Sequence, residues 1–347
     1  MKNALIDIGS NSIRLTLYET SGDSFKVLFR EKVMAGLAGY VEGGRLSDEG
    51  VERACSGLLT FRSILQTLEI DRISVFATAS LRNVSNTAEA LARIEAETGY
   101  SVDVISGKDE ALLGYAGAMR ELRLTSGAFV DVGGASTELV EFDGGAPGLS
   151  VSLPVGSLSL YRRCVKKILP GDGSLRRLRQ AIEEAFDASA LDLEPRQVLV
   201  GVGGTARATL KLARHYYGDA AIDPEPAASA VAPAAGASSL DPAAGEVSGI
   251  TAAQLDGLVE FLCSGEKEAA DLILRHEADR VHTIVPGMLI LQHAFHLFRA
   301  RRLVVSKYGV REGYLCQRVL SSTLNSPASP SPSACPGGAT PTPRTAS

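Results

Sequence analysis

The chain has 347 residues, of which 45% are hydrophobic and 22% are charged, and its formal net charge is −5. This length exceeds one ordinary hydrophobic core and predicts two domains. A weakly acidic chain gives no indication of a nucleic-acid partner. The five scattered cysteines include no CxxC pair, which argues against a zinc site and a disulfide framework and favours a reducing compartment.

No secretory signal follows Met1, and the longest apolar stretch, residues 281–298, is interrupted by proline, glutamine and histidine. We therefore expect this stretch to be a buried helix rather than a membrane span. We therefore expect a cytoplasmic protein that binds neither a membrane nor nucleic acid.

Strands and helices alternate along the first part of the chain. Strands are expected at about residues 4–8, 13–19 and 25–33, followed by a helix over 47–67 with Ser47 as its N-cap. The elements expected next are a strand at 73–77, a helix at 87–98, a strand at 102–105 and a helix at 108–120.

The same plan restarts at Ala128, with three strands up to residue 153. After them we expect helices near 157–168 and 174–188, a strand at 197–202, a helix at 205–216, helices near 251–263 and 278–298, a strand at 303–306 and a helix at 311–320. A strand meander followed by alternating strands and helices, present twice, indicates two mixed-sheet α/β domains.

We assign residues 1–121 to domain I and residues 122–308 to domain II, and expect the helix at 309–321 to pack back on domain I. Two segments lie outside this plan. Residues 219–249, rich in alanine and proline, predict a flexible insertion in domain II, and residues 322–347 predict a disordered Pro/Ser-rich tail.

One motif occurs twice: DIGSNSIRL over residues 7–15 and DVGGASTEL over residues 131–139. Each copy follows an apolar run and is expected to form a strand, a glycine-containing turn and a second strand. Backbone N–H groups in such turns approach anions closely, which favours phosphate binding. The turn residues proposed to bind phosphate are Gly9, Ser10, Asn11 and Ser12, and Gly133, Gly134, Ala135 and Ser136.

Asp7 and Asp131 would repel phosphate directly, so their natural use is to hold Mg²⁺, which bridges to phosphate. A single Asp-x-Gly motif is more simply a strand-ending turn. Two aligned copies favour the functional interpretation. A third glycine motif, GVGGTARAT, ends a strand and opens a helix, so Gly203, Gly204 and Thr205 either bind another phosphate or allow close strand–helix packing.

Two glutamates and two arginines lie beside these turns. Glu110 begins the helix expected to join the domains, and Glu138 occupies the place that Arg14 has in the first motif. Hydrolysis of a phosphoanhydride needs a base for the attacking water, which either carboxylate can supply. From the residues alone, Glu110 is better explained as an acid that stabilises a helix N-terminus than as a catalytic base. Arg82 and Arg311 are candidates for phosphate contacts or for ordinary ion pairs.

Together these residues resemble the exopolyphosphatase/guanosine pentaphosphate phosphohydrolase (Ppx/GppA) family. The matching segments, in family order, are DIGSNSIRL, ATASLRN, ISGKDEA, DVGGASTEL, GVGGTARAT, ADRVHTIVPGMLIL and SKYGVREGYL. The resemblance implies the duplicated actin-like, sugar-kinase-like (ribonuclease H-like) ATPase fold with substrate in the cleft between two domains. It also implies Mg²⁺-dependent release of terminal phosphate from polyphosphate, or of the 5′ γ-phosphate of pppGpp.

The resemblance assigns the general base to Glu110 and the second essential acid to Glu138. It assigns metal binding to Asp7, Asp131 and Glu138, and a polyphosphate contact to Arg82. Two departures stand out. Ala135 replaces a glycine that is usual in the family, which is expected to crowd a phosphate oxygen or change the turn, and the chain matches a short form without C-terminal helical domains.

These features predict an exopolyphosphatase that favours short chains. Three alternatives remain open: a pppGpp phosphohydrolase, a catalytically weak regulator that binds polyphosphate or guanosine tetra/pentaphosphate, and an actin-like kinase. A homodimer is also left open.

Overall fold

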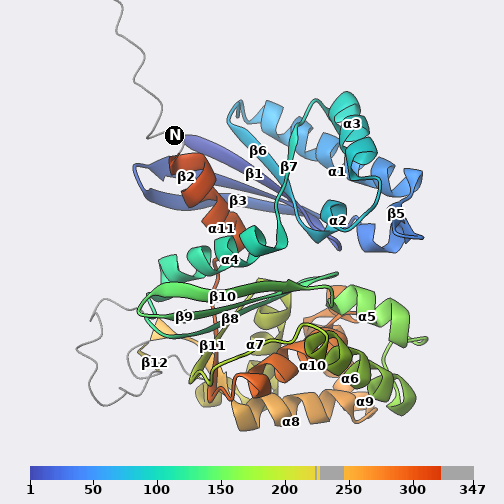
Figure 1. Ribbon diagram of the computed structural model, residues 1–347, viewed down its shortest axis with the longest axis vertical. Coiled ribbons are helices and arrows are strands. Elements are labelled where there is room, and N and C mark those ends of the chain that lie inside the picture. Colours follow the sequence, from blue (N-terminus) through green and yellow to red (C-terminus); the bar gives the residue numbers. More distant parts are fainter. Residues whose placement is uncertain (223–224, 227–245, 322–347) are drawn as a thin grey trace, which may run out of the picture.

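The computed structural model describes residues 1–222, 225–226 and 246–321. Its first sheet has the strand order β3-β2-β1-β6-β7 (Figure 1). β1 (Lys2–Ile8), β2 (Ile13–Ser21) and β3 (Ser24–Val33) form an antiparallel meander. β6 (Ile73–Ala77) pairs parallel with β1, and β7 (Val102–Val104) pairs parallel with β6.

Alternate residues of β1 face opposite sides of this sheet, as the pleat requires. Ala4, Ile6 and Ile8 pack in one core with α1 (Asp48–Thr67) and α3 (Thr87–Thr98), whereas Leu5 belongs to a second core on the other face. The predicted cap is confirmed, because the Ser47 side chain accepts a hydrogen bond from Gly50 N at 3.3 Å. The short elements of this part are η1 (Leu37–Tyr40), β4 (Val41–Glu42), β5 (Arg45–Leu46) and α2 (Ala79–Arg82).

The second sheet repeats the plan with the order β10-β9-β8-β11-β15-β14. Its antiparallel meander consists of β8 (Gly127–Val132), β9 (Thr137–Asp143) and β10 (Ala146–Leu153). β11 (Val198–Val202) runs parallel to both β8 and β15 (Arg302–Val305). The repeated order confirms the predicted duplicated, actin-like α/β fold.

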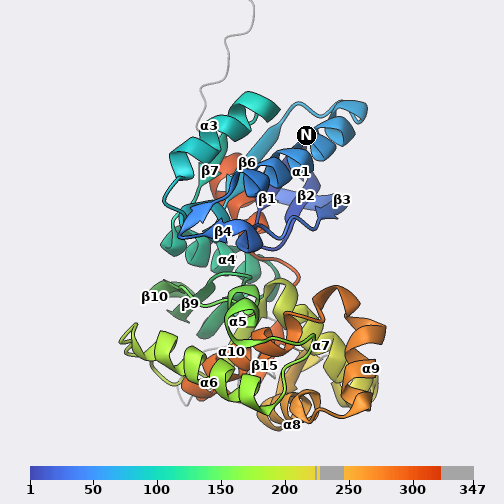
Figure 2. The same cartoon turned by 90° about the vertical axis from the view of Figure 1, so that its right-hand side faces the viewer.

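Helices surround α10 (Ile284–Leu297), which is almost entirely buried in the largest core (Figure 2). They are α5 (Ser157–Cys164), α6 (Asp172–Asp187), α7 (Gly203–Tyr217) and α8 (Ala252–Cys263), with α9 (Lys267–His276) and η3 (Ala278–Arg280) beside them. None of the helices in the described ranges is both long and apolar enough to cross a membrane.

α4 (Gly107–Leu122) lies between the two sheets (Figure 1). Its Ala111 and Tyr115 pack with β8, while Leu113 packs against the first sheet together with the C-terminal segment. That segment consists of α11 (Val310–Tyr314) and a π-helical turn, Leu315–Leu320. The Tyr314 ring stacks on Phe76 with centroids 4.5 Å apart, so the chain returns to the first sheet.

Three expectations need correction. The insertion expected at residues 219–249 is shorter at both ends, because Asp219–Ile222 form a 3-10 turn (η2) and Gly249–Thr251 form β14, which pairs antiparallel with β15. The helix expected at 278–298 begins at Ile284. α9 was not expected. Two short strands, β12 (Glu225–Pro226) and β13 (Glu246–Val247), pair with each other. Residues 227–245 and the tail expected at 322–347 lie outside the described residues.

Candidate active site

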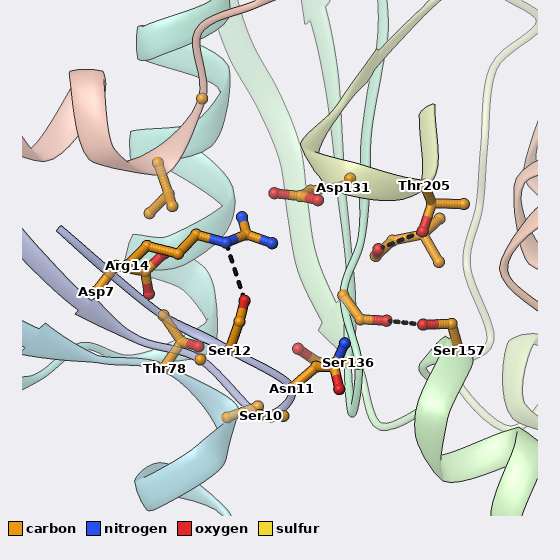
Figure 3. Close-up of a pocket in the computed structure, with 18 of the residues that line it drawn as sticks. Asp7, Ser10, Asn11, Ser12, Arg14, Thr78, Asp131, Ser136, Ser157 and Thr205 are labelled. Carbon is orange, nitrogen blue, oxygen red and sulfur yellow. Dashed lines mark hydrogen bonds between the residues drawn. The ribbon is translucent and has the colours of Figure 1, made fainter. Parts of the chain in front are cut away.

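The two repeated turns face each other across a cavity between the sheets (Figure 3). They have the same backbone bond: Gly9 N donates to Ser12 O at 3.2 Å, and Gly133 N donates to Ser136 O at 2.9 Å. A Cβ atom on Gly134 would lie 3.3 Å from Ser10 Cβ, so the turns are nearly in contact. The duplication in the sequence therefore places two similar anion-binding turns opposite each other.

The third glycine motif forms the start of α7 beside the second turn. Gly203 has φ 75° and no room for a side chain, since a Cβ atom there would overlap Asp131 Oδ1. Only glycine meets both conditions. Gly203 does not itself line the cavity, but Gly204 and Thr205 do, and Thr205 Oγ1 donates to Val132 O at 3.0 Å. The motif thus serves packing and also contributes to the cavity wall.

Basic side chains from distant parts of the chain meet in this cavity. Arg14 Nε donates to Ser12 Oγ at 3.0 Å, and Arg311 Nη1 donates to Thr16 Oγ1 at 2.8 Å (Figure 3 shows the first bond). Burial, together with the charges of Arg14 and Arg311, lowers the pKa of Arg207 to about 10. The basic residues that line the cavity are Arg14, Arg207, Arg280, Lys307 and Arg311.

This mutual repulsion among partly desolvated cations favours an anion. It produces a local positive field in a chain whose net charge is −5. The geometry of the cavity is therefore suited to a polyanion.

Asp7 and Asp131 lie at the cavity from opposite sheets (Figure 3). Burial raises the pKa of both carboxyls. The charge of Asp7 also raises the pKa of Asp131, and the charge of Glu312 raises that of Asp7. Neither makes a side-chain ion pair within the described residues. Two such carboxylates fit a Mg²⁺ ion, which is usually bound through one or two carboxylates together with water and substrate phosphates.

A three-carboxylate metal site is not preformed. No group of three or more His, Cys, Asp or Glu side chains in the described part of the chain is arranged to hold a metal ion. Glu138, expected as a third ligand, is 1% exposed, does not line the cavity, and accepts a hydrogen bond from Ser152 Oγ at 2.7 Å. The fit to Mg²⁺ therefore rests on Asp7 and Asp131.

Glu110 lines the cavity at the N-terminus of α4, where Ser106 caps the helix. Burial raises its pKa to about 7, against the lowering effect of Arg82, whose Nη1 lies 2.7 Å from Glu110 Oε2. Burial and the charge of Glu110 also raise the pKa of Glu138. A carboxyl group that titrates near neutrality is suited to proton transfer.

Arg82 was expected to contact phosphate, but it does not line the cavity. Its guanidinium pairs with Glu110, donates to Ile105 O at 3.2 Å and lies 4.0 Å from Glu138 Oε1. It therefore connects the two glutamates as an ion pair, and its contact with phosphate stays a prediction.

Ala135 lines the cavity and is partly buried. Its backbone φ angle is not positive. The methyl group therefore imposes no left-handed strain on the turn, and a change in the shape of the turn stays a prediction. Its effect on a phosphate oxygen stays a prediction.

Several residues that line the cavity were not predicted from the sequence. The repeated motif could have identified Arg14 as a site residue, because Arg14 aligns with Glu138 in the second copy. Arg207 lies within the third glycine motif, four residues after Gly203. The others come from separate helices and loops that only the fold brings together here: Thr78, Ser157, Arg280, Thr283, Lys307 and Glu312.

The fold and cavity define an actin-like α/β protein with a basic cleft between its two repeats. The chain belongs to the Ppx/GppA phosphatase family, whose model matches residues 16–322. It is thus a phosphatase-type hydrolase.

Individual relatives agree with this assignment. A Haemophilus influenzae protein named "Putative exopolyphosphatase" is 26% identical over 316 residues, 90% of each chain. The crystal structure of the Aquifex aeolicus Ppx/GppA family member is 26% identical, covers 93% of this chain and 98% of its own, and has a TM-score of 0.69. An exopolyphosphatase structure from Cytophaga hutchinsonii, 20% identical, shares the fold with a TM-score of 0.76 over 93% of this chain and 98% of its own.

Proposed function

We propose that the protein is a Mg²⁺-dependent exopolyphosphatase that releases the terminal phosphate of short polyphosphate chains. The observation that carries this proposal is a cavity that combines five basic side chains with Glu110, a carboxyl whose pKa is raised to about 7, among the described residues. The names of the Haemophilus and Cytophaga relatives also support a polyphosphate substrate.

In the proposed mechanism, the two glycine turns bind successive phosphates through backbone N–H groups and through Ser12 and Ser136. Arg14 and Arg311 neutralise the phosphate oxygens and orient the terminal group. Asp7 and Asp131 would hold Mg²⁺ together with the substrate. The chemistry that this ion supplies when bound is neutralisation of charge on the transferred phosphoryl group.

Glu110 is the proposed general base. Its Oε2 atom accepts from Arg82, so Oε1 is the atom assigned to take the proton of the attacking water. Arg82 and Ser152 orient the two glutamates, and burial together with the charge of Glu110 raises the pKa of Glu138.

The test is phosphate release from polyphosphates of several lengths, pppGpp and ATP with Mg²⁺, using Glu110→Gln beside the wild type. Loss of the base is expected to reduce kcat by about 10²–10⁴-fold. Glu95→Gln, an exposed change on α3 of the same type, is the control and should retain wild-type activity. Equal activity of Glu110→Gln and the control would refute the mechanism.

The same assay separates the alternatives. Release from pppGpp alone would assign the protein to nucleotide hydrolysis, and tight binding without turnover would favour a regulator. Omission of Mg²⁺, with EDTA present, is expected to abolish release.

A further inference from the structure

Three basic residues of α7 recur at intervals of four and three positions: Arg207, Lys211 and Arg214. This spacing places them along one face of the helix. With a rise of 1.5 Å per residue, the row spans roughly 10 Å. We call these residues the α7 basic stripe.

The stripe begins inside the active-site cavity, because Arg207 is one of its lining residues. A second cavity continues from there past Lys211, and it shares Gly204, Arg207 and Arg280 with the first. A third cavity lies on the other side of the stripe, where Lys211 and Arg214 meet Lys307. The basic surface is therefore continuous with the site of the proposed chemistry.

Positive charge predominates over this surface. Two of its acidic groups form ion pairs with lysine side chains. Asp279 Oδ2 lies 2.6 Å from Lys32 Nζ, and Glu277 Oε1 lies 3.1 Å from Lys211 Nζ. Among the described residues that line these two outer cavities, seven are basic and three acidic, with histidine neutral. They are Lys32, Arg207, Lys211, Arg214, Arg275, Arg280 and Lys307, and Glu121, Glu277 and Asp279.

The exposure of the stripe increases from Arg207, which is largely buried in the cavity, to Lys211, which is exposed, and Arg214 is half-buried. Lys211 has 51% of its side chain exposed and donates to His276 O, and Arg214 Nη2 donates to Ser248 Oγ at 2.7 Å. These contacts hold both side chains in place along the outer cavities, although the charge of Lys211 is partly offset by Glu277. A row of fixed cations matches a ligand with regularly repeated negative charges.

We propose that the α7 basic stripe binds the phosphates of a polyphosphate chain that extend beyond the reactive end. This inference rests on the proposed function and adds a length dependence to it. Because the stripe ends at Arg214, affinity should rise with chain length and then level off once the stripe is filled. Phosphates beyond the end of the stripe should therefore add no further affinity.

The test compares Lys211→Gln/Arg214→Gln with Lys166→Gln/Arg176→Gln, a control with the same change of charge at exposed positions of the second repeat. Binding of tripolyphosphate and of long-chain polyphosphate is measured by titration calorimetry without divalent metal, at several salt concentrations. The stripe variant should raise the Kd for the long chain about tenfold and make its salt dependence shallower, since each lost phosphate contact lowers the slope. The Kd for tripolyphosphate should change much less, and the control should match the wild type.

An unchanged long-chain Kd in the stripe variant, or an equal loss for both ligands, would overturn the inference. If the double variant has a lower thermal stability, Lys211→Gln alone gives the same comparison with one contact removed. Turnover by the wild type with Mg²⁺ is scored separately. Binding of long chains without hydrolysis would refute the proposed function and leave the stripe assignment intact.

Discussion

At the scale of single residues, the pKa of Glu110 is set by groups that raise it and a group that lowers it. Burial and the charges of Asp131 and Asp7 raise its pKa, while Arg82 lowers it. A general base acts only when ionised, so kcat/KM should increase as pH rises through about 7. Arg82 is therefore expected to set the pH range of activity without touching substrate.

Arg82→Gln removes the charge that favours the ionised form of Glu110. The pKa of Glu110 should rise further, and the acidic limb of the pH–rate profile should move to higher pH. Arg82→Lys, which retains the charge, should leave the limb closer to that of the wild type. The measurement is kcat/KM for tripolyphosphate across pH 5–9. A limb that stays in place in Arg82→Gln would show that Arg82 does not tune the base.

Gly203 combines a left-handed backbone with direct contact to Asp131. Gly203→Ala should cost about 1–3 kcal/mol in free energy of unfolding from the strained φ, and it should also lower activity by displacing the Asp131 carboxylate. Gly218→Ala is a matched control, because Gly218 has φ 88° but no atom within 4 Å of an added Cβ. Urea unfolding and initial rates separate the two effects. Activity in Gly203→Ala equal to that of Gly218→Ala would contradict the role given to the Asp131 contact.

At the scale of elements, α4 and α11 cross with their backbones in contact. A Cβ atom on Gly313 would overlap Leu113 O, and one on Gly117 would overlap Gly309 O. This close approach lets α11 carry Arg311 and Glu312 into the cavity while Tyr314 remains packed on Phe76. The glycines of the two helices thus determine where the C-terminal residues reach the site.

Gly313→Ala should therefore destabilise the protein by about 1–3 kcal/mol, the usual cost of overpacking. Since Arg311 would move with the helix, the KM for polyphosphate should rise as well. Gly173→Ala in α6 provides the comparison, because its added Cβ would make only an ordinary 3.6 Å contact with Arg177 Nη1. Thermal unfolding and KM are the readouts. A Gly313→Ala protein as stable as Gly173→Ala would mean that the crossing adjusts freely.

The sequence predicted the two meanders and most helices because their apolar periodicity is local. It failed where a local pattern continues through a change of structure. Residues 278–283 were expected to belong to the helix of α10, yet Ala278–Arg280 form a 3-10 helix and residues 281–283 form a turn, and Arg280 reaches the cavity.

The candidate site was predictable to the extent that it is encoded in the repeated motif. Asp7, Asp131 and the serines of both turns lie where the duplication predicts. Arg280 and Lys307 could not be assigned in this way, because their convergence with Arg14 depends on the packing of elements more than 250 residues apart.

At the scale of the whole molecule, an acidic chain contains a concentrated positive site between its two repeats. Arg14, Arg207 and Arg311 each lie within the electrostatic reach of another, and burial lowers the pKa of Arg14 and Arg207. Repulsion of this kind opposes the closed arrangement of the repeats, whereas a bound polyanion offsets it. Ligand and fold stability should therefore be linked.

Tripolyphosphate, added without divalent metal, is expected to stabilise the protein by about 2.7 kcal/mol at a hundredfold excess over its Kd. Arg14→Gln removes one of the repelling charges, and it also removes the hydrogen bond to Ser12. The free variant should therefore lose no more stability than that hydrogen bond contributes. At the same ligand concentration, its gain in stability should be smaller than that of the wild type. Arg176→Gln on α6 should show the full wild-type gain. Thermal unfolding with increasing tripolyphosphate measures all three proteins, and high salt should reduce the gain because the attraction is screened. If tripolyphosphate stabilised Arg14→Gln and Arg176→Gln equally, the phosphates would bind outside this cavity. The positive charge of the cavity would then have no part in the proposed chemistry.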